Sequence, residues 1–246
     1  MKAEDNLEKY ADPAAYDERH GGFAADVEFI LEELGEVPAR VIDLACGTGR
    51  VSIPLVRAGH RVTGVDLHEG MIGRAREKAD SEGLDVRFLL QDCRHLDLPA
   101  PADLIVMSGN SFQHFLTNED QDLLFEAVRR HLSPGGRFIF DTRNPVLHEL
   151  AEPDRYEESA VIGGRSVREL HTETYDPVSQ VLRCETETID GDPVRRDAIS
   201  LRYTYPLEME RLVRQHGFEF ERRYGDWRRG EFVPGSGQVV CVCRLI

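Results

Sequence analysis

The chain has 246 residues, of which 41% are hydrophobic and 30% are charged, and its formal net charge is −15. This length and composition suit one ordinary globular domain, or one domain with a sizeable insertion. The negative charge repels phosphate backbones, and no segment matches a signal peptide or a membrane span, so we expect neither a nucleic-acid nor a membrane partner.

Strand and helix patterns alternate through the first part of the chain. After an apolar helical face at residues 26–34, strands are expected at residues 40–45, 61–66, 86–91, 102–108 and 136–141. Helical patterns lie between several of them, at residues 49–58, 69–81 and 118–131. Strands of about six residues that alternate with helices indicate a parallel sheet with right-handed crossovers.

The pattern changes after Pro145 to an alternation of period two. Strands are expected at residues 166–175, 181–189 and 198–205, with turn residues Asp176-Pro177 and Asp190-Gly191-Asp192-Pro193 between them. This pattern predicts an antiparallel meander inserted after the fifth strand. A helix from Pro206 to His216-Gly217 and two strands, 218–224 and 238–244, complete the chain.

The five cysteines are scattered and odd in number, which favours reduced thiols and a cytoplasmic location over a disulfide framework. Cys241 and Cys243 lie two apart in an apolar strand pattern. We expect them to be buried small side chains rather than ligands, and we expect no metal site.

The segment from Asp43 to Gly49 carries the clearest functional pattern. An apolar run ends in Asp43, and two glycines spaced by one residue, Gly47 and Gly49, precede a helical pattern. Glycine has no Cβ, so the backbone of such a loop can approach a bound molecule closely. A second strand pattern ends in Asp66, where an acid can accept hydrogen bonds from both hydroxyls of a ribose. Together these features predict a cofactor that contains a nucleoside.

The same residues indicate which cofactor is bound. A dinucleotide fingerprint has a third glycine where this chain has Ser52, and the carboxylate of Asp43 would repel a pyrophosphate. It suits a cofactor with a positive centre and an ammonium group, as in S-adenosylmethionine (SAM). The run Asp43-Leu44-Ala45-Cys46-Gly47-Thr48-Gly49 resembles motif I of the class I SAM-dependent methyltransferases. The resemblance continues through Val65-Asp66, Leu90-Gln91-Asp92 and Leu132-Ser133-Pro134-Gly135-Gly136.

This resemblance implies a Rossmann-like α/β fold with a seven-stranded sheet, mostly parallel with the last strand antiparallel, and helices on both faces. Residues 1–145 would form the SAM-binding core with an N-terminal lid segment. Residues 146–205 would form the inserted antiparallel sheet above the acceptor site, and residues 206–246 would return to the core.

The resemblance also assigns cofactor contacts. The loop backbone would line the methionine part, and Asp43 would attract its ammonium group; Asp66 would bind the ribose. Asp92 would bind the adenine amine, or alternatively it only caps the turn at Arg94. The full set of expected cofactor residues is Asp43, Ala45, Cys46, Gly47, Gly49, Asp66, Leu67, Met71, Asp92, Cys93 and Ser108.

Two residues, His114 and Tyr16, are candidate catalytic residues. His114 follows the fourth strand and could take a proton from an acceptor amine or hydroxyl, or it could simply pack there. Tyr16 lies in the N-terminal segment and could orient the acceptor or anchor that segment. Arg143, Asn144, Arg202, Tyr203 and Trp227 could line the acceptor pocket.

We therefore expect a methyltransferase that moves a methyl group from SAM, leaving S-adenosylhomocysteine, to a nitrogen or oxygen of a small molecule. The chain would act as a monomer or homodimer. The alternatives are a non-catalytic SAM-binding or partner-binding protein, an NAD-dependent oxidoreductase and a protein methyltransferase. The sequence leaves the acceptor and the number of methyl groups open.

Overall fold

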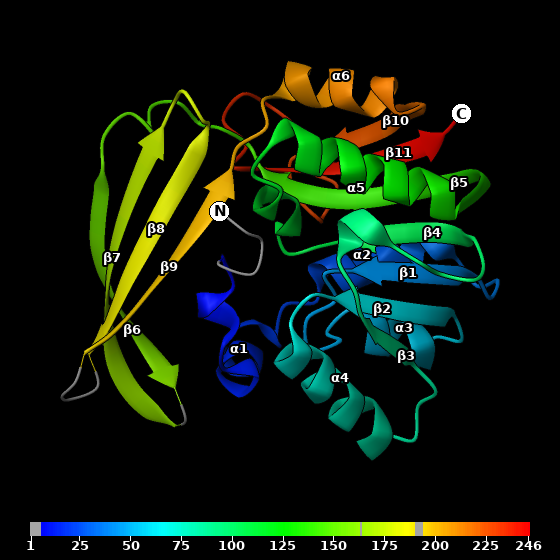
Figure 1. Cartoon of the computed structure of the whole chain (residues 1–246), viewed down its shortest axis with the longest axis horizontal. Coiled ribbons are helices and arrows are strands. Elements are labelled where there is room, and N and C mark those ends of the chain that lie inside the picture. Colours follow the sequence, from blue (N-terminus) through cyan, green and yellow to red (C-terminus); the bar gives the residue numbers. More distant parts are fainter. Residues whose placement is uncertain (1–5, 163, 190–193) are drawn as a thin grey trace.

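The computed structural model describes residues 6–162, 164–189 and 194–246 of the chain. The described residues form a seven-stranded sheet and a separate four-stranded sheet (Figure 1). In spatial order the larger sheet consists of β10 (Phe218–Tyr224), β11 (Gln238–Leu245), β5 (Leu132–Arg143), β4 (Ala102–Met107), β1 (Arg40–Leu44), β2 (Arg61–Asp66) and β3 (Arg87–Leu90). Strand β11 is antiparallel to both of its neighbours, and the other pairs are parallel. The predicted seven-stranded fold is thus confirmed.

Helices cover both faces of this sheet because neighbouring strand residues point to opposite sides. Ile42 packs in one core cluster with residues of two helices, and Val41 packs in another cluster with residues of two different helices. The helices of the first face are α5 (Asn118–His131) and α6 (Pro206–Gln215), and those of the second are α2 (Ala25–Leu34) and α3 (Ser52–Arg57). Helix α4 (Glu69–Ser81) packs on a smaller cluster around Ile72 and Phe88.

The four-stranded sheet is an antiparallel meander of β6 (Asp154–Ile162), β7 (Arg165–Asp176), β8 (Val181–Ile189) and β9 (Arg195–Arg202). The meander was expected after the fifth strand, but with three strands. The first of the four, β6, was missed because nearly all of its described side chains are exposed, so its sequence lacks an apolar alternation. The turn expected at residues 190–193 lies outside the described residues.

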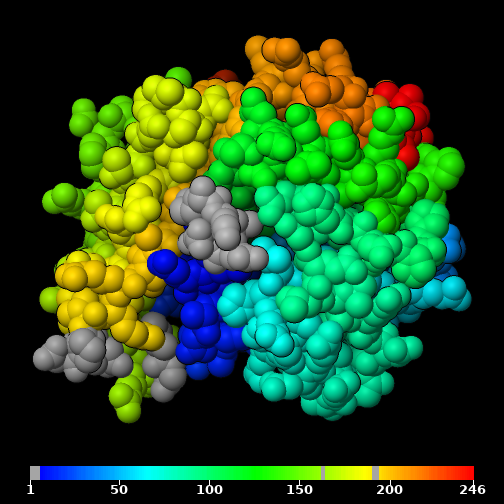
Figure 2. All heavy atoms as spheres, in the orientation of Figure 1, coloured from blue at the N-terminus to red at the C-terminus, as the bar shows by residue number. Residues whose placement is uncertain are grey.

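The N-terminal segment contains a 3₁₀ turn, η2 (Glu8–Tyr10), and helix α1 (Pro13–His20). Asp12 caps α1 by accepting hydrogen bonds from the backbone of Ala14 and Ala15, and Pro13 occupies the first helical position. The segment lies between the two sheets (Figure 1). Figure 2 shows it (blue) between the atoms of β8 and β9 and those of the first half of the core. Two more 3₁₀ turns, η3 (Cys93–His95) and η4 (Ser111–His114), follow β3 and β4.

Of the helices in the described part of the chain, none is both long enough and apolar enough to cross a bilayer. All five cysteines, which lie within the described ranges, are free and buried.

Candidate functional site

The loop between β1 and α3 has an unusual backbone. Ala45, Gly47 and Gly49 have φ values of +53°, +53° and +78°. An alanine in this left-handed region is strained, and such strain is typical of binding sites. Gly49 is required by packing, because a Cβ there would come within 3.0 Å of the Phe88 ring. The loop therefore turns sharply and presents its backbone to the space above the sheet.

Asp66, at the end of β2, holds this loop. One carboxylate oxygen accepts a hydrogen bond from Gly47 N and the other from His68 N, both at 2.8 Å. Burial raises the pKa of Asp66, although these hydrogen bonds act in the opposite direction. Each oxygen keeps a further lone pair, so Asp66 can still accept two hydrogen bonds from a ligand.

A cavity of about 590 Å³, here called the smaller cavity, lies above the loop. It contains nine of the residues expected from the sequence: Tyr16, Ala45, Gly47, Asp66, Leu67, Met71, Asp92, Cys93 and His114. Side chains and backbone at the carboxyl ends of β1, β2 and β3 thus meet His114 of η4 around one cavity.

Four of the expected residues do not line the smaller cavity: Asp43, Cys46, Gly49 and Ser108. Asp43 is 2% exposed and accepts a hydrogen bond from Ser52 Oγ at 2.6 Å, beneath the loop. Burial raises the pKa of Asp43 to about 7. Asp43 is therefore not part of the cavity wall, and its hydrogen bond ties the end of β1 to the first residue of α3. Ser108 Oγ instead lies 3.3 Å from the Arg50 guanidinium.

Asp92 both caps a turn and lines the cavity. Its carboxylate accepts hydrogen bonds from the backbone and the guanidinium of Arg94, and Arg94 also pairs with Asp120 of α5. Burial opposes ionisation of Asp92, but the hydrogen bonds from Arg94 lower its pKa. The cap at Arg94 is therefore present, and it fixes Asp92 at the cavity edge.

Helix α1 is attached to the loop by Asp17, which the sequence did not reveal as a functional residue. Its carboxylate accepts hydrogen bonds from Thr48 Oγ1 at 2.5 Å, Lys78 Nζ at 2.9 Å and Arg74 Nε at 3.1 Å. These contacts join α1 to the loop and to α4. They place the N-terminal segment over the smaller cavity.

Arg50 is a second residue that sequence reasoning missed, although it directly follows the glycine loop. Its guanidinium forms a bidentate pair with Asp26 at 2.7 and 2.5 Å and donates to Phe23 O at 2.8 Å. The Asp26 side chain is fully buried, and that of Arg50 is 12% exposed. This pair joins α2 to the start of α3, next to the binding loop.

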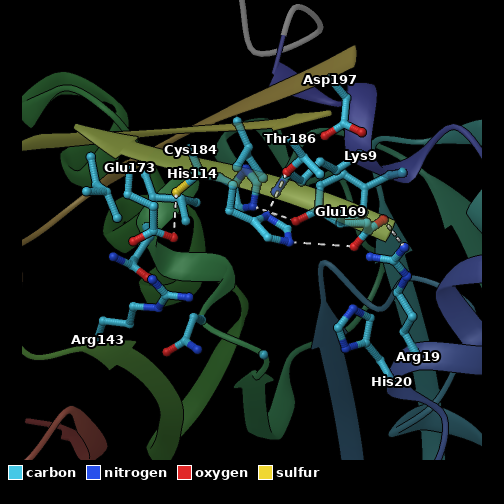
Figure 3. A pocket seen from close by; sticks show the side chains of 18 of the residues that line it. Lys9, Arg19, His20, His114, Arg143, Glu169, Glu173, Cys184, Thr186 and Asp197 are labelled. Carbon is cyan, nitrogen blue, oxygen red and sulfur yellow. Dashed lines mark hydrogen bonds and ion pairs between the residues drawn. The ribbon is translucent and has the colours of Figure 1, made fainter. Parts of the chain in front are cut away.

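A larger cavity of about 1360 Å³ lies between the carboxyl edge of the seven-stranded sheet and the inner face of the four-stranded sheet. Figure 3 shows Glu169, Glu173 and Cys184 of the four-stranded sheet facing it, with Arg143 and Arg19 approaching from the core and from α1. Acidic side chains outnumber lysines and arginines among the described residues of its wall.

The residues expected around an acceptor divide into two groups. Arg143, Asn144 and Tyr203 line the larger cavity. Arg202 and Trp227 do not, because Arg202 is buried and pairs with Glu208 at 2.5 Å, and Trp227 is buried and donates to Asp141 at 3.2 Å. Those two expectations, which rested on topology alone, were wrong.

Of the described residues, four line both cavities: Tyr10, Tyr16, Gly109 and His114. We call this group the junction. Tyr10 Oη lies 2.9 Å from His114 Nε2, and Asn6 Nδ2 lies 3.4 Å from His114 Nδ1. Asn6 also donates to Ser200 O and accepts from Ser200 N, which fixes its amide so that an N–H faces Nδ1. Nδ1 is therefore the acceptor and Nε2 carries the proton.

Burial lowers the pKa of His114 to about 4, so the imidazole is neutral at neutral pH. Both ring nitrogens already have partners. The contacts therefore favour a role in positioning over the role of a general base that the sequence suggested.

The chain has relatives among known methyltransferases. A family described as "Methyltransferase domain" matches residues 41–136. The glycine/sarcosine N-methyltransferase of Parasynechococcus marenigrum (strain WH8102) is 30% identical over 209 residues, which are 83% of this chain and 72% of that protein. The chain belongs to the class I SAM-dependent methyltransferases. This confirms the family predicted from residues 43–49.

Two further similarities differ in extent. The CcbJ methyltransferase from Streptomyces caelestis has a TM-score of 0.83 at 26% identity and covers 96% of this chain and 97% of its own. The putative methyltransferase YqeM of Bacillus subtilis (strain 168) is 36% identical over 129 residues, so the match spans about half of each protein. The CcbJ comparison therefore includes the four-stranded sheet of this methyltransferase, because it covers nearly the whole chain.

The buried pair of Arg50 and Asp26 predicts a large loss of stability when it is broken. Arg50→Ala leaves the Asp26 carboxylate buried without its partner, so the free energy of unfolding should fall by about 3–5 kcal/mol. Urea denaturation measures this change. The control is Arg57→Ala, which removes an exposed pair with Glu82 and should cost about 1 kcal/mol or less. Equal losses would contradict the structural part assigned to Arg50.

The buried neutral His114 predicts a specific dependence of stability on pH. The unfolded chain takes up this proton near the ordinary pKa of 6.5, whereas the folded methyltransferase takes it up only near pH 4. The contribution of neutral His114 to the free energy of unfolding is therefore lost as the pH falls from 6.5 towards 4. Between pH 7 and pH 5, His114→Gln should lose about 2 kcal/mol less unfolding free energy than the wild type. Exposed His148→Gln is the control, and parallel curves for His114→Gln and the wild type would contradict the prediction.

Proposed function

We propose that this methyltransferase transfers a methyl group from SAM to a nitrogen of a small amine. The observation that carries the proposal is the junction, where a loop-lined cavity and a larger acidic cavity share Tyr10, Tyr16, Gly109 and His114. A cofactor in one cavity and an acceptor in the other would meet there. In-line transfer needs close contact between the two reactants above all else.

The residues of the smaller cavity fit SAM. Gly47 has no side chain to fill the loop, Asp66 has free lone pairs for a ribose, and Leu67 and Met71 offer apolar surface for an adenine. The Asp66 side chain lines the cavity, and burial raises the pKa values of Asp43 and Asp66, so a bound cation would favour the ionised form of both carboxyl groups. When bound, SAM would supply the electrophilic methyl group.

The chemistry of the junction favours nitrogen over oxygen as the acceptor atom. An alcohol becomes a good nucleophile only on losing a proton at a pH far above neutral, whereas a protonated amine loses its extra proton to solvent much more readily and is then nucleophilic. Among the four described junction residues, burial lowers the pKa of His114 to about 4 and raises those of Tyr10 and Tyr16. None of them is therefore a base suited to neutral pH. Methyl transfer to an oxygen is therefore the less favoured alternative.

Two further observations support an amine. Acidic side chains on the wall of the larger cavity, among them Glu173 and Asp141, attract a basic acceptor. Relatives named for nitrogen transfer include the glycine/sarcosine N-methyltransferase already described and the cypemycin N-terminal methyltransferase of Streptomyces sp, which is 33% identical over 114 residues. The second name makes a peptide amine the other candidate acceptor.

A large open acceptor cavity speaks against a non-catalytic SAM-binding protein, because in such a protein the acceptor space would be filled. Membership of the methyltransferase family speaks against the alternative of an NAD-dependent oxidoreductase.

Cofactor binding is expected to depend on Asp66. Asp66→Ala removes two charge-assisted acceptor positions, so affinity for S-adenosylhomocysteine should fall roughly 100-fold. Isothermal titration calorimetry measures this, and circular dichroism checks that the variant is folded. Asp80→Ala removes an exposed acid of α4 and should bind as the wild type does. Unchanged affinity in Asp66→Ala would remove the basis for the cofactor site.

Turnover tests the function itself. We expect release of S-adenosylhomocysteine when the wild type is incubated with SAM and a set of small primary and secondary amines, and little release with the corresponding alcohols. Gly109→Ala should lower this rate about tenfold or more, because its Cβ would enter the junction.

Gly135→Ala is a matched control for this variant. The two glycines have φ values of +72° and +73°, and an added Cβ meets no atom within 4 Å at either position. Both variants should therefore lose about 1–2 kcal/mol of stability from backbone strain, but only Gly109 lies at the junction. Equal turnover in the two variants would contradict the proposed meeting point.

A further inference from the structure

Three side chains with metal-binding groups gather on the inner face of the four-stranded sheet, away from the junction. Glu169 and His171 are two residues apart on β7, so they point to the same face. Glu158 of β6 lies directly across from Glu169. One ligand atom from each of the three lies within 4.8 Å of the other two. All three residues line the larger cavity, where Figure 3 shows Glu169.

Two of these atoms are buried without a partner. Glu169 Oε2 and His171 Nε2 have no hydrogen-bond partner among the described residues. They lie 3.7 Å apart on side chains that are only 2% and 9% exposed. The nearest oxygen of Glu158 lies 3.2 Å from the same Nε2 atom. Buried polar groups are normally satisfied, and this cluster can be satisfied in two ways: by a proton on Nε2, which makes ion pairs with both glutamates, or by a cation bound between the three side chains.

The neighbouring strand orients both buried groups. His171 Nδ1 lies 3.1 Å from Thr186 Oγ1, and Thr188 Oγ1 donates to Glu169 Oε1 at 3.2 Å. With its proton on Nδ1, His171 presents the lone pair of Nε2 to the cluster. Metal-binding histidines are commonly held this way, with the second ring nitrogen bonded to an outer group.

Arg19 of α1 also contacts this cluster, as Figure 3 shows, but through a different oxygen of Glu169. It pairs with Glu169 Oε1 at 2.5 Å and leaves Oε2 free. Two carboxylates against one guanidinium leave the cluster with a net negative charge. It can therefore still attract a divalent cation.

We propose that Glu158, Glu169 and His171 bind a divalent transition-metal ion of the Zn²⁺ or Mn²⁺ class. One imidazole and two carboxylates form a ligand set that suits these ions. Ligands of a tetrahedral ion lie about 3.3 Å apart when each metal–ligand bond is about 2.0–2.1 Å. The distances from His171 Nε2 to the two glutamates, 3.2 and 3.7 Å, are close to this value. A remaining coordination position would face the larger cavity and accept an oxygen ligand from a bound molecule.

Metal binding can be measured directly on the whole chain. The protein is stripped with EDTA, dialysed against Mn²⁺ or Co²⁺, and analysed by calorimetry and elemental analysis. Mn²⁺ is the stricter of the two probes, because Zn²⁺ and Co²⁺ also bind free thiols and the chain has five free cysteines. We expect one ion per chain in the wild type and loss of binding in His171→Ala and Glu169→Gln. Thr186→Val should weaken binding about 10–100-fold by removing the partner of Nδ1.

The control is His148→Ala, which removes a histidine of an exposed histidine–glutamate pair and should bind as the wild type does. The absence of stoichiometric Mn²⁺ or Co²⁺ uptake by folded wild type would overturn the proposal. So would full binding in His171→Ala, or an equal loss in the control. S-adenosylhomocysteine binding to the same samples reports on the smaller cavity, so failure of the metal site is distinguishable from failure of the proposed methyl transfer.

Discussion

The hydrogen bonds of Asn6 hold the two sheets in the arrangement on which both cavities depend. Its side chain donates to Ser200 O at 2.8 Å and accepts from Ser200 N at 2.7 Å, and its other N–H faces His114. Asn6 is 5% exposed. One buried amide thus connects strand β9 with the end of η4, and Tyr10, four residues later, closes the junction. No apolar side chain can replace this amide without leaving backbone groups of Ser200 unpaired.

Two acidic side chains of the seven-stranded sheet, Asp43 beneath the loop and Asp141 on β5, are buried, and burial makes their ionisation costly. The pKa of Asp43 is raised to about 7 and that of Asp141 to about 6, in both cases chiefly by burial. Arg50 offsets part of this cost but is already paired with Asp26. A bound cation would stabilise these carboxylates in their ionised form. The site is therefore electrostatically incomplete by itself, which is the behaviour expected of a site for a positively charged ligand.

The parts of the fold that the sequence predicted well are those with strong local signals. Helices α4 and α5 and strand β2 were predicted to the residue, because apolar periodicity and capping residues agree there. Helix α1 was missed because it has no apolar face, although the Asp12-Pro13 start was readable. Strand β6 was missed because it is exposed, so the position of Glu158 opposite Glu169 was not predicted either.

In the candidate site, too, residues with a local sequence signal were predicted and residues that depend on distant contacts were not. Motif residues such as Gly47 and Asp66 were predicted because their backbone position follows from the strand–loop–helix pattern. Arg50, Asp17 and Asn6 were not, because their partners lie 24 or more residues away and only the folded chain brings them together. Asp43 was expected at the cofactor, but it is buried beneath the loop, and that burial depends on packing that no local pattern encodes.

The N-terminal segment covers the site with two kinds of contact, and they differ in strength. Among the residues of α1, all within the described part of the chain, none is buried. Its contacts include the ion pairs of Asp17 with α4 and the ion pair of Arg19 with Glu169 of β7. The Asp17 pairs are partly exposed on both sides, so they contribute little and are weakened by salt, whereas Arg19 pairs with the buried Glu169. Asn6 and Tyr10 instead make buried or partly buried hydrogen bonds to β9 and η4. The Asp17 contacts of α1 are therefore more sensitive to salt than the hydrogen bonds that hold residues 6–10 at the junction.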